Sequence, residues 1–162
     1  MTGPVLPNFV AMEHICNFHK VSDLLACSGQ PREGQLASIA GEGYQVVINL
    51  GLSDGKYALA DEATSVRALG LAYHHIPVQF DNPQLSELQT FVADMKQHKG
   101  EKILVHCAAN YRASAFTGLY LFAEGKLDED AMQEFIGEVW QPDAVWQQFI
   151  EEAAEHIKDP PS

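Results

Sequence analysis

The chain has 162 residues, a length typical of one domain that buries a substantial core. Hydrophobic residues make up 46% of the chain and charged residues 20%, a globular composition that excludes a disordered, collagen-like or coiled-coil protein. The formal net charge is −12, because 10 Lys and Arg face 22 Asp and Glu, so the chain lacks the basic surface of a nucleic-acid or anionic-membrane binder. We therefore expect no nucleic-acid partner and no membrane partner.

The cysteines and the N-terminal segment indicate in which cellular compartment the protein works. Cys16, Cys27 and Cys107 cannot all pair within one chain, and none of their spacings matches a zinc pattern. We therefore expect free thiols in a reducing compartment. The N-terminal segment has neither a basic region nor a continuous apolar stretch, which predicts a cytoplasmic protein, although a signal peptide already removed would leave the same sequence.

Strand and helix patterns alternate along the chain, with no repeat or linker between them. In chain order they predict a strand at 24–27, a helix at 35–40, a strand at 45–50, a helix at 61–69, a strand at 73–78, a helix from about 83 to 100, a strand at 102–107, and helices at 112–123, around 132–139 and at 144–157. Asn82 and Pro83 suit the N-cap and first position of the third helix. We expect a single domain over 1–162, with a loose arm at 1–12 and a frayed tail at 159–162.

This alternation predicts an α/β fold, a mostly parallel sheet of four to five strands that helices cover on both sides. The runs QVVINL (45–50) and KILVHC (102–107) are apolar throughout, as strands buried on both faces are. Ligands of such sheets bind beyond the carboxyl ends of the strands. The site is therefore expected where the segments 51–54, 79–82 and 107–112 leave the sheet.

The segment VHCAANYRAS (105–114) sets a cysteine at the end of a strand and an arginine at the start of a helix. Loop N–H groups and a helix N-terminus can bind an oxyanion, and Arg112 can add two charge-assisted donors. The same positive environment favours the ionised form of Cys107, which could then attack phosphorus. The alternative is that Cys107 is a small buried apolar residue.

This segment resembles the active-site loop of the cysteine-dependent, dual-specificity-like protein phosphatases. Together with SGQP (28–31) and VINL (47–50), it resembles the bacterial beta-lactamase-hydrolase-like phosphatase group over residues 17–123. The resemblance implies a protein tyrosine phosphatase-like fold and hydrolysis of phosphate monoesters, from a small molecule or a phosphoprotein, with no cofactor and no metal. It makes Cys107 the nucleophile, Arg112 the ligand of the phosphoryl oxygens and Asp81, 26 residues before Cys107, the general acid. It adds His106 as a supporting residue and a phosphate-binding set: Ala108, Ala109, Asn110, Tyr111, Arg112 and Ser114.

The loop departs from the family pattern, in which five residues separate Cys from Arg and glycine stands third after Cys. Here four residues separate Cys107 from Arg112, and Asn110 stands at the glycine position. Asn tolerates positive φ better than other non-glycine residues, so the turn can survive. Ser114 still matches the family's hydroxyl residue, which helps to stabilise the thiolate leaving group.

Two other functions fit the shorter loop. Rhodanese-type sulfurtransferases have four residues between a persulfide-carrying Cys and an Arg, as this chain does. A phosphate-binding module that cannot turn over is the third hypothesis.

Several side chains also have structural interpretations: Asp81 can be a helix-entry residue, His106 a satisfied buried histidine, Tyr111 an exposed side chain, Asp54, Asp61 and Glu62 surface charge, His74 and His75 core or surface residues, Trp140 and Trp146 packing residues, and Cys16 and Cys27 structural thiols.

Overall fold

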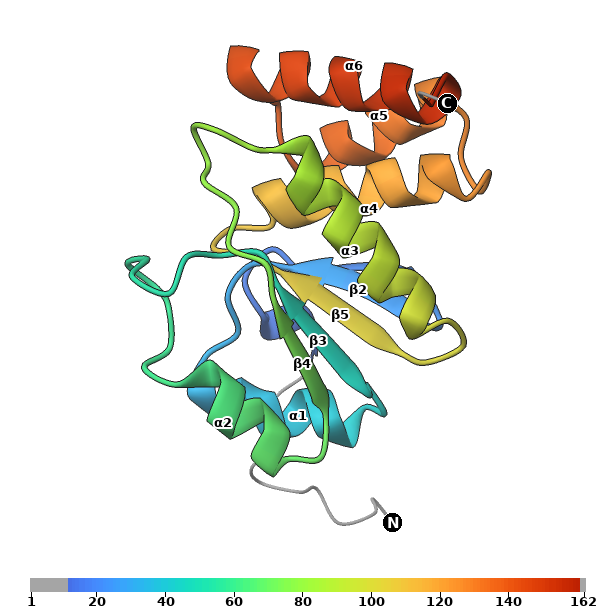
Figure 1. Cartoon of the computed structure of the whole chain (residues 1–162). Helices are drawn as coiled ribbons and strands as arrows, with labels where there is room; N and C mark the ends of the chain where they lie inside the picture. Colours follow the sequence, from blue (N-terminus) through green and yellow to red (C-terminus); the bar gives the residue numbers. More distant parts are fainter. Residues whose placement is uncertain (1–11, 161–162) are drawn as a thin grey trace.

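The computed structural model describes residues 12–160 and contains a five-stranded sheet of order β1-β2-β5-β3-β4 (Figure 1). The strands are β1 (His19–Ser22), β2 (Leu25–Ser28), β3 (Val46–Asn49), β4 (Ala72–His75) and β5 (Ile103–His106). β2, β5, β3 and β4 run parallel, and β1 is antiparallel to β2 at one edge. The central β5 therefore delivers its carboxyl end between β2 and β3.

Helices cover both faces of the sheet, as Figure 1 shows. α1 (Leu36–Gly41) and α2 (Glu62–Ala68) lie on one side, and α3 (Leu85–Gln97), α4 (Tyr111–Ala123), α5 (Glu129–Val139) and α6 (Ala144–Lys158) lie on the other. Two short 3₁₀ turns, η1 (Met12–His14) and η2 (Glu33–Gln35), precede β1 and α1. Alternate residues of the strands enter two hydrophobic clusters, so that Val46 and Ile48 pack in one and Val47 in the other. The predicted α/β architecture is confirmed.

Three local predictions need correction. β1 was not expected, because His19–Ser22 is a short, half-exposed edge strand with an irregular register and carries no apolar run. Helix α3 begins at Leu85 with Gln84 as N-cap and a Glu87 capping box, so Asn82 is not the cap; its Oδ1 accepts from Gln84 Nε2 at 2.8 Å. The predicted loose arm included Met12, which is buried. Residues 1–11 and 161–162 lie outside the described part of the chain.

Candidate active site

Residues 107–110 join β5 directly to α4, and Arg112 is the second residue of that helix; the segment 107–112 is called the loop below. Asn110 has φ 74° and ψ 4°, the left-handed conformation, and α4 begins at the next residue. Asn is tolerated in this region because its short polar side chain makes local hydrogen bonds. The turn brings the first turn of α4 back over the cysteine, so that the Ala113 N–H donates to Cys107 Sγ at 3.4 Å.

The loop is fixed from the side of β1 and β2. Asn110 Nδ2 donates to the Asn17 carbonyl at 2.9 Å, and Asn17 Nδ2 donates back to the Ala109 carbonyl at 3.0 Å. Gly29 forms a bridge with Ala109, and a Cβ added at Gly29 would lie 2.7 Å from the Ala108 oxygen. Only glycine allows this approach, which explains the SGQP turn in terms of backbone contact.

Arg112 is buried, with 8% of its surface exposed. One guanidinium nitrogen donates to the Val78 carbonyl at 2.8 Å, whereas Nε has no hydrogen-bond partner within residues 12–160. The guanidinium carbon lies 6.0 Å from the centre of the Phe80 ring. Arg112 and Phe80 line a cavity of about 280 Å³, here called the arginine cavity, together with Ala108, Gly51, Lys56 and other residues. A buried cationic donor without a protein acceptor can be satisfied by a bound anion or by water.

The Cys107 side chain is fully buried and contributes to the hydrophobic core. Its sulfur still accepts the N–H of Ala113, and the sequence holds Arg112 five residues away on the same loop. Ser114 is also buried, and its Oγ donates to the Tyr111 carbonyl at 3.0 Å. Tyr111 is partly exposed and stacks on Trp140 with ring centres 4.5 Å apart.

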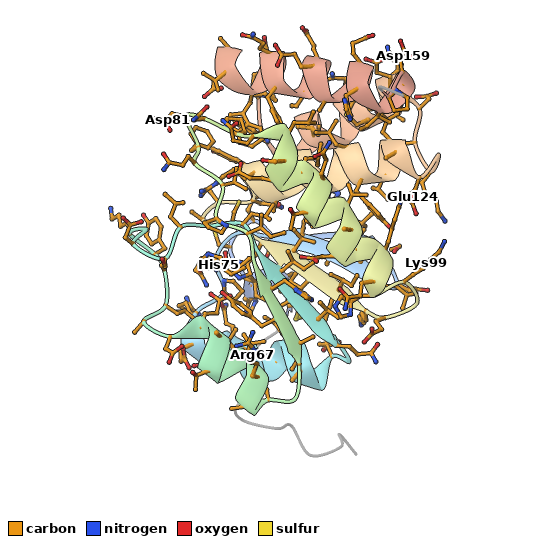
Figure 2. All side chains as sticks on the ribbon, in the orientation of Figure 1. Arg67, His75, Asp81, Lys99, Glu124 and Asp159 are labelled. Carbon is orange, nitrogen blue, oxygen red and sulfur yellow. The ribbon has the colours of Figure 1, made fainter. Side chains whose placement is uncertain are left out.

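Asp81 lies in the segment between β4 and α3, at its exposed outer bend (Figure 2). The preceding residue is anchored, because the Trp146 indole N–H donates to the Phe80 carbonyl at 2.7 Å. Asp81 does not cap α3, since Gln84 has that position. Phe80 lines the arginine cavity, whereas Asp81, the next residue, is exposed and does not line it.

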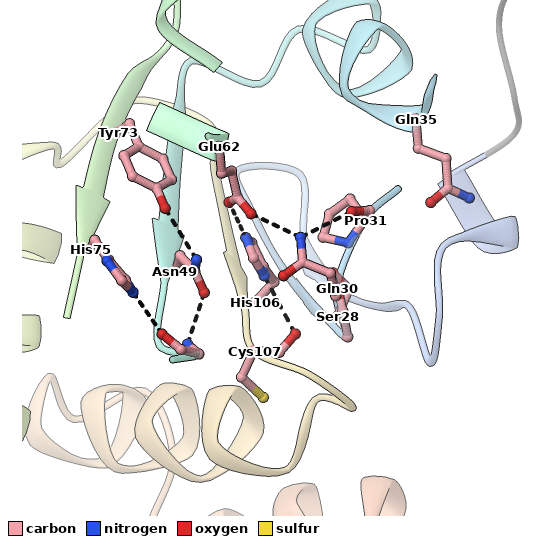
Figure 3. Close-up of polar contacts among 12 residues, drawn as sticks. Ser28, Gln30, Pro31, Gln35, Asn49, Glu62, Tyr73, His75, His106 and Cys107 are labelled. Atoms are coloured by element: carbon pink, nitrogen blue, oxygen red, sulfur yellow. Dashed lines mark hydrogen bonds and ion pairs between the residues drawn. The ribbon is translucent and has the colours of Figure 1, made fainter. Parts of the chain in front are cut away.

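A buried pair of His106 and Glu62 lies beneath the loop (Figure 3). His106 Nε2 is 2.6 Å from one Glu62 oxygen, and Gln30 Nε2 donates to the other at 2.8 Å. Burial alone would raise the pKa of Glu62, but the hydrogen bonds from His106 and Gln30 outweigh it, so the pKa lies below its ordinary value of 4.5. Glu62 is 6% exposed, so the prediction that it is surface charge was wrong.

The other acids and histidines near the loop each contact a different group. Asp61 caps α2, its Oδ1 accepting from the Thr64 N–H. His75 Nε2 donates to the Gly51 carbonyl at 2.6 Å, while His74 Nε2 faces His98 Nε2 at 2.7 Å. Within residues 12–160 no group of three or more His, Cys, Asp and Glu side chains could hold a metal ion.

The segment after β3 is held close to the loop. Asn49 Oδ1 accepts the Gly51 N–H at 2.8 Å, and Asn49 Nδ2 donates to the Tyr73 hydroxyl at 3.1 Å (Figure 3). Burial raises the pKa of Tyr73 to about 12, although the Asn49 hydrogen bond acts against it. A Cβ at Gly51 would lie 3.7 Å from the Cys107 Cα. We expected the segments that follow β3 and β5 to lie together at the carboxyl edge of the sheet, and the structure confirms this.

Solved structures similar to this chain over most of its length include Tk-PTP and PTPMT1. A mutant form of Tk-PTP is 21% identical with a TM-score of 0.73, and PTPMT1 in complex with PI(5)P is 14% identical with a TM-score of 0.74. Each alignment covers 87% of this chain and 96% of the other. The chain thus has the protein tyrosine phosphatase fold, as predicted.

The family follows from a nearer relative. A candidate phosphatase of the DUF442 family from Shewanella putrefaciens CN-32 is 35% identical, with a TM-score of 0.83, over 90% of this chain and 96% of that one. The chain belongs to the DUF442 family, and a general phosphatase function is supported. No family model matches the sequence.

A curated relative supports the predicted bacterial group. The "Beta-lactamase hydrolase-like protein" of Xylella fastidiosa is 28% identical over 116 residues, which is 70% of this chain. The chain spans about a quarter of that relative's length, since the match covers 27% of it. In the described residues, no helix combines the length and apolar character needed to span a membrane.

Proposed function

We propose that the chain hydrolyses phosphate monoesters through a cysteinyl-phosphate intermediate on Cys107. One observation carries the proposal: Arg112 is buried and tied to the Val78 carbonyl, yet its Nε–H has no partner within residues 12–160. This donor belongs to the same short loop as a sulfur that already accepts a helix N-terminal N–H. A phosphoryl group bound there would meet the guanidinium and the loop amides beside the nucleophile.

The chemistry divides into two displacements. In the first, the bond between Cys107 Sγ and phosphorus forms while the bond to the leaving oxygen breaks, and Asp81 gives its proton to that oxygen. In the second, water attacks phosphorus, the sulfur–phosphorus bond breaks, and the proton of the water passes to the Asp81 carboxylate. The products are the alcohol, inorganic phosphate, the restored thiolate and the restored acid. Amides and Arg112 would stabilise the charge on the phosphoryl oxygens throughout.

A second candidate function is oxyanion binding without turnover. The full burial of Cys107 favours it, because the nucleophile must reach phosphorus for the first displacement. The sulfurtransferase alternative rests on the four residues between Cys107 and Arg112, and the same experiment tests it.

The experiment compares hydrolysis of para-nitrophenyl phosphate with sulfur transfer from thiosulfate to cyanide. Wild type is expected to release phosphate, and Cys107→Ser is expected to abolish the release. Cys27→Ala is the matched control, because burial raises the pKa of the Cys27 thiol to about 12 and leaves it a poor nucleophile. Its activity should remain near that of wild type.

Three results would contradict the proposal. Persulfide formation on Cys107 without phosphate release would favour sulfur transfer. Phosphate binding without either reaction would favour the binding module. Hydrolysis that survives Cys107→Ser would remove the cysteine from the mechanism.

A further inference from the structure

Two histidines join β4 to the C-terminal end of α3. His74 lies on β4 and His98 is the C-cap residue of α3, and their Nε2 atoms are 2.7 Å apart. The ring centres are 4.9 Å apart, and the ring planes meet at 59°. The distance between the two nitrogens is that of a hydrogen bond, so one Nε2 must carry a proton and the other must accept it. The contact therefore depends on how many protons the two rings hold.

Each ring faces a carboxylate with its other nitrogen. His98 Nδ1 is 2.9 Å from Glu101 Oε1, and His74 Nδ1 is 3.7 Å from Asp94 Oδ2. The short contact fixes a proton on His98 Nδ1, which leaves His98 Nε2 as the acceptor and the Nε2–H of His74 as the donor. Asp94 then stabilises a further proton when His74 Nδ1 takes one up.

The pair can hold one extra proton but not two. With one extra proton, a charged His74 lies between Asp94 and the neutral His98, and every ring N–H faces an acceptor. A second extra proton would place an N–H on both Nε2 atoms, and two donors cannot remain 2.7 Å apart. Two adjacent cations would also repel each other, because the His74 and His98 side chains expose only 27% and 12% of their surface. Double protonation must therefore separate the rings.

The charged groups around the pair do not change this limit. Ile48, which lies opposite His74 on β3, is uncharged. A groove of about 620 Å³ adjoins His98, and the other titratable side chains that line it are Lys99, Glu101, Tyr120, Glu124 and Lys126. The lysines oppose a second positive charge on the rings. The glutamates can balance charge but cannot accept a proton bond between two Nε2 donors.

We propose that His74 and His98 form a pH-sensitive latch between β4 and α3, which is closed while one proton lies between the two Nε2 atoms and opens when both rings are fully protonated. Opening would release the C-terminal end of α3 from the sheet. Residues 76–84, which join β4 to α3, include Val78, the acceptor of Arg112, and Phe80, which lines the arginine cavity. The latch itself lies outside that cavity, and the inference does not depend on the proposed function.

The closed latch binds fewer protons than the unfolded chain in acid. A histidine of an unfolded chain gains its proton as the pH falls through about 6.5. The unfolded chain then holds two extra protons on these residues, whereas the closed latch holds one. Because the unfolded state binds more protons, stability must fall as the pH falls. A difference of one proton raises the unfolding equilibrium constant by up to about tenfold per pH unit.

Urea unfolding tests the latch one pH unit above and one below the ordinary histidine value of about 6.5. Between these conditions the unfolding equilibrium constant of wild type should rise about tenfold more than that of His98→Gln, which leaves His74 free to take up its proton beside Asp94. His14→Gln is the matched control, because His14 is exposed and its side chain has no hydrogen bond or ion pair within residues 12–160. The control should keep the pH dependence of wild type. The contributions of all other titrating groups cancel when the variants are compared.

An equal rise in wild type and His98→Gln would overturn the latch, as would a His14→Gln variant that behaves like His98→Gln.

Histidine ring ¹⁵N spectra of the wild-type protein give a second test, which does not depend on how well a variant folds. At neutral pH one of the two Nε2 atoms should carry a proton and the other should not. As the pH falls, the second Nε2 proton should appear together with a loss of exchange protection at the His98 amide, which donates to the Asp94 carbonyl at 3.2 Å. Two protonated or two unprotonated Nε2 atoms at neutral pH would overturn the inference. Double protonation with an unchanged amide protection factor would overturn it as well.

Discussion

The loop of residues 107–112 separates two regions that use polar groups in opposite ways. The base, formed by buried Glu62, His106 and Asn110 with half-buried Gln30, is held together by hydrogen bonds between side chains and from a side chain to the backbone. The exposed rim is formed by Arg32 and Tyr57, which line cavities beside the loop, and by Asp81, which is exposed to solvent; these side chains have few such bonds. Contacts in the base fix the loop conformation, whereas the groups of the rim remain available to a substrate. Variants in the two regions should therefore differ in what they change, stability in the base and catalysis at the rim.

Arg112 belongs to both regions, since its side chain is buried but its Nε–H is unpartnered within residues 12–160. We expect Arg112→Lys to lower kcat/KM for para-nitrophenyl phosphate by about 10²–10³, because lysine keeps the charge but loses the planar, paired donors. Steady-state kinetics measure this loss. Arg67→Lys is the control: Arg67 also donates to a backbone carbonyl, that of Tyr73 at 3.4 Å, but lines another cavity. Equal losses in both variants would contradict the assignment.

A substitution of Asp81 tests whether the exposed rim contributes to catalysis. We expect Asp81→Asn to lower kcat/KM for phenyl phosphate about 10²-fold, because the departing phenoxide then lacks a proton donor. The effect on para-nitrophenyl phosphate should be much smaller, since nitrophenoxide leaves readily without a proton. Thermal unfolding should show no change, because Asp81 is exposed and does not cap α3.

Asp54→Asn provides a control, as Asp54 is an exposed acid on the segment after β3. A loss that is the same for both leaving groups, or that Asp54→Asn reproduces, would remove Asp81 from the general-acid role.

A substitution of Glu62 tests whether the buried region beneath the loop contributes to stability. Because the pKa of Glu62 is lower in the folded protein than the ordinary 4.5, the carboxylate stabilises the folded state above that pH, and the stabilisation is lost as the pH falls through the lower, folded value. We expect Glu62→Gln to lower the free energy of unfolding by about 1–3 kcal/mol at pH 7, the cost of weakening a buried charge-assisted hydrogen bond. Urea unfolding at a series of pH values measures both effects, and the variant should lose stability less steeply below pH 4.5.

A more exposed pair provides the comparison. His98 Nδ1 and Glu101 Oε1 are 2.9 Å apart, but the Glu101 side chain is 41% exposed, against 5% for Glu62, so Glu101→Gln should cost about 0.5 kcal/mol or less. If the two substitutions cost the same, burial does not set the strength of the Glu62 contact.

The sequence predicted the structural features that depend on a local pattern of residues. The apolar run before Cys107 indicates a buried strand, the parallel topology places its carboxyl end beside those of β2 and β3, and Asn110 suits a left-handed turn; the structure confirms each of these. That this edge of the sheet binds a ligand stays a prediction. It could not predict contacts between distant segments. Glu62 is 44 residues from His106 and looks like an ordinary charge in the first turn of a helix. Asn17 is 93 residues from Asn110, next to an edge strand without an apolar pattern.

The last prediction concerns the turn itself. Asn110 combines a left-handed backbone, φ 74°, with a hydrogen bond from its side chain to the Asn17 carbonyl, and comparing glycine with alanine isolates the contribution of the backbone conformation. Asn110→Gly loses the hydrogen bond but adopts the conformation freely, whereas Asn110→Ala loses both, so alanine should cost about 1 kcal/mol more in urea unfolding. The glycine variant also carries the residue of the family pattern, so its loop should keep its affinity for inorganic phosphate while alanine weakens it. Equal stability of the two variants would mean that the side-chain contact, and not the backbone conformation, explains the asparagine.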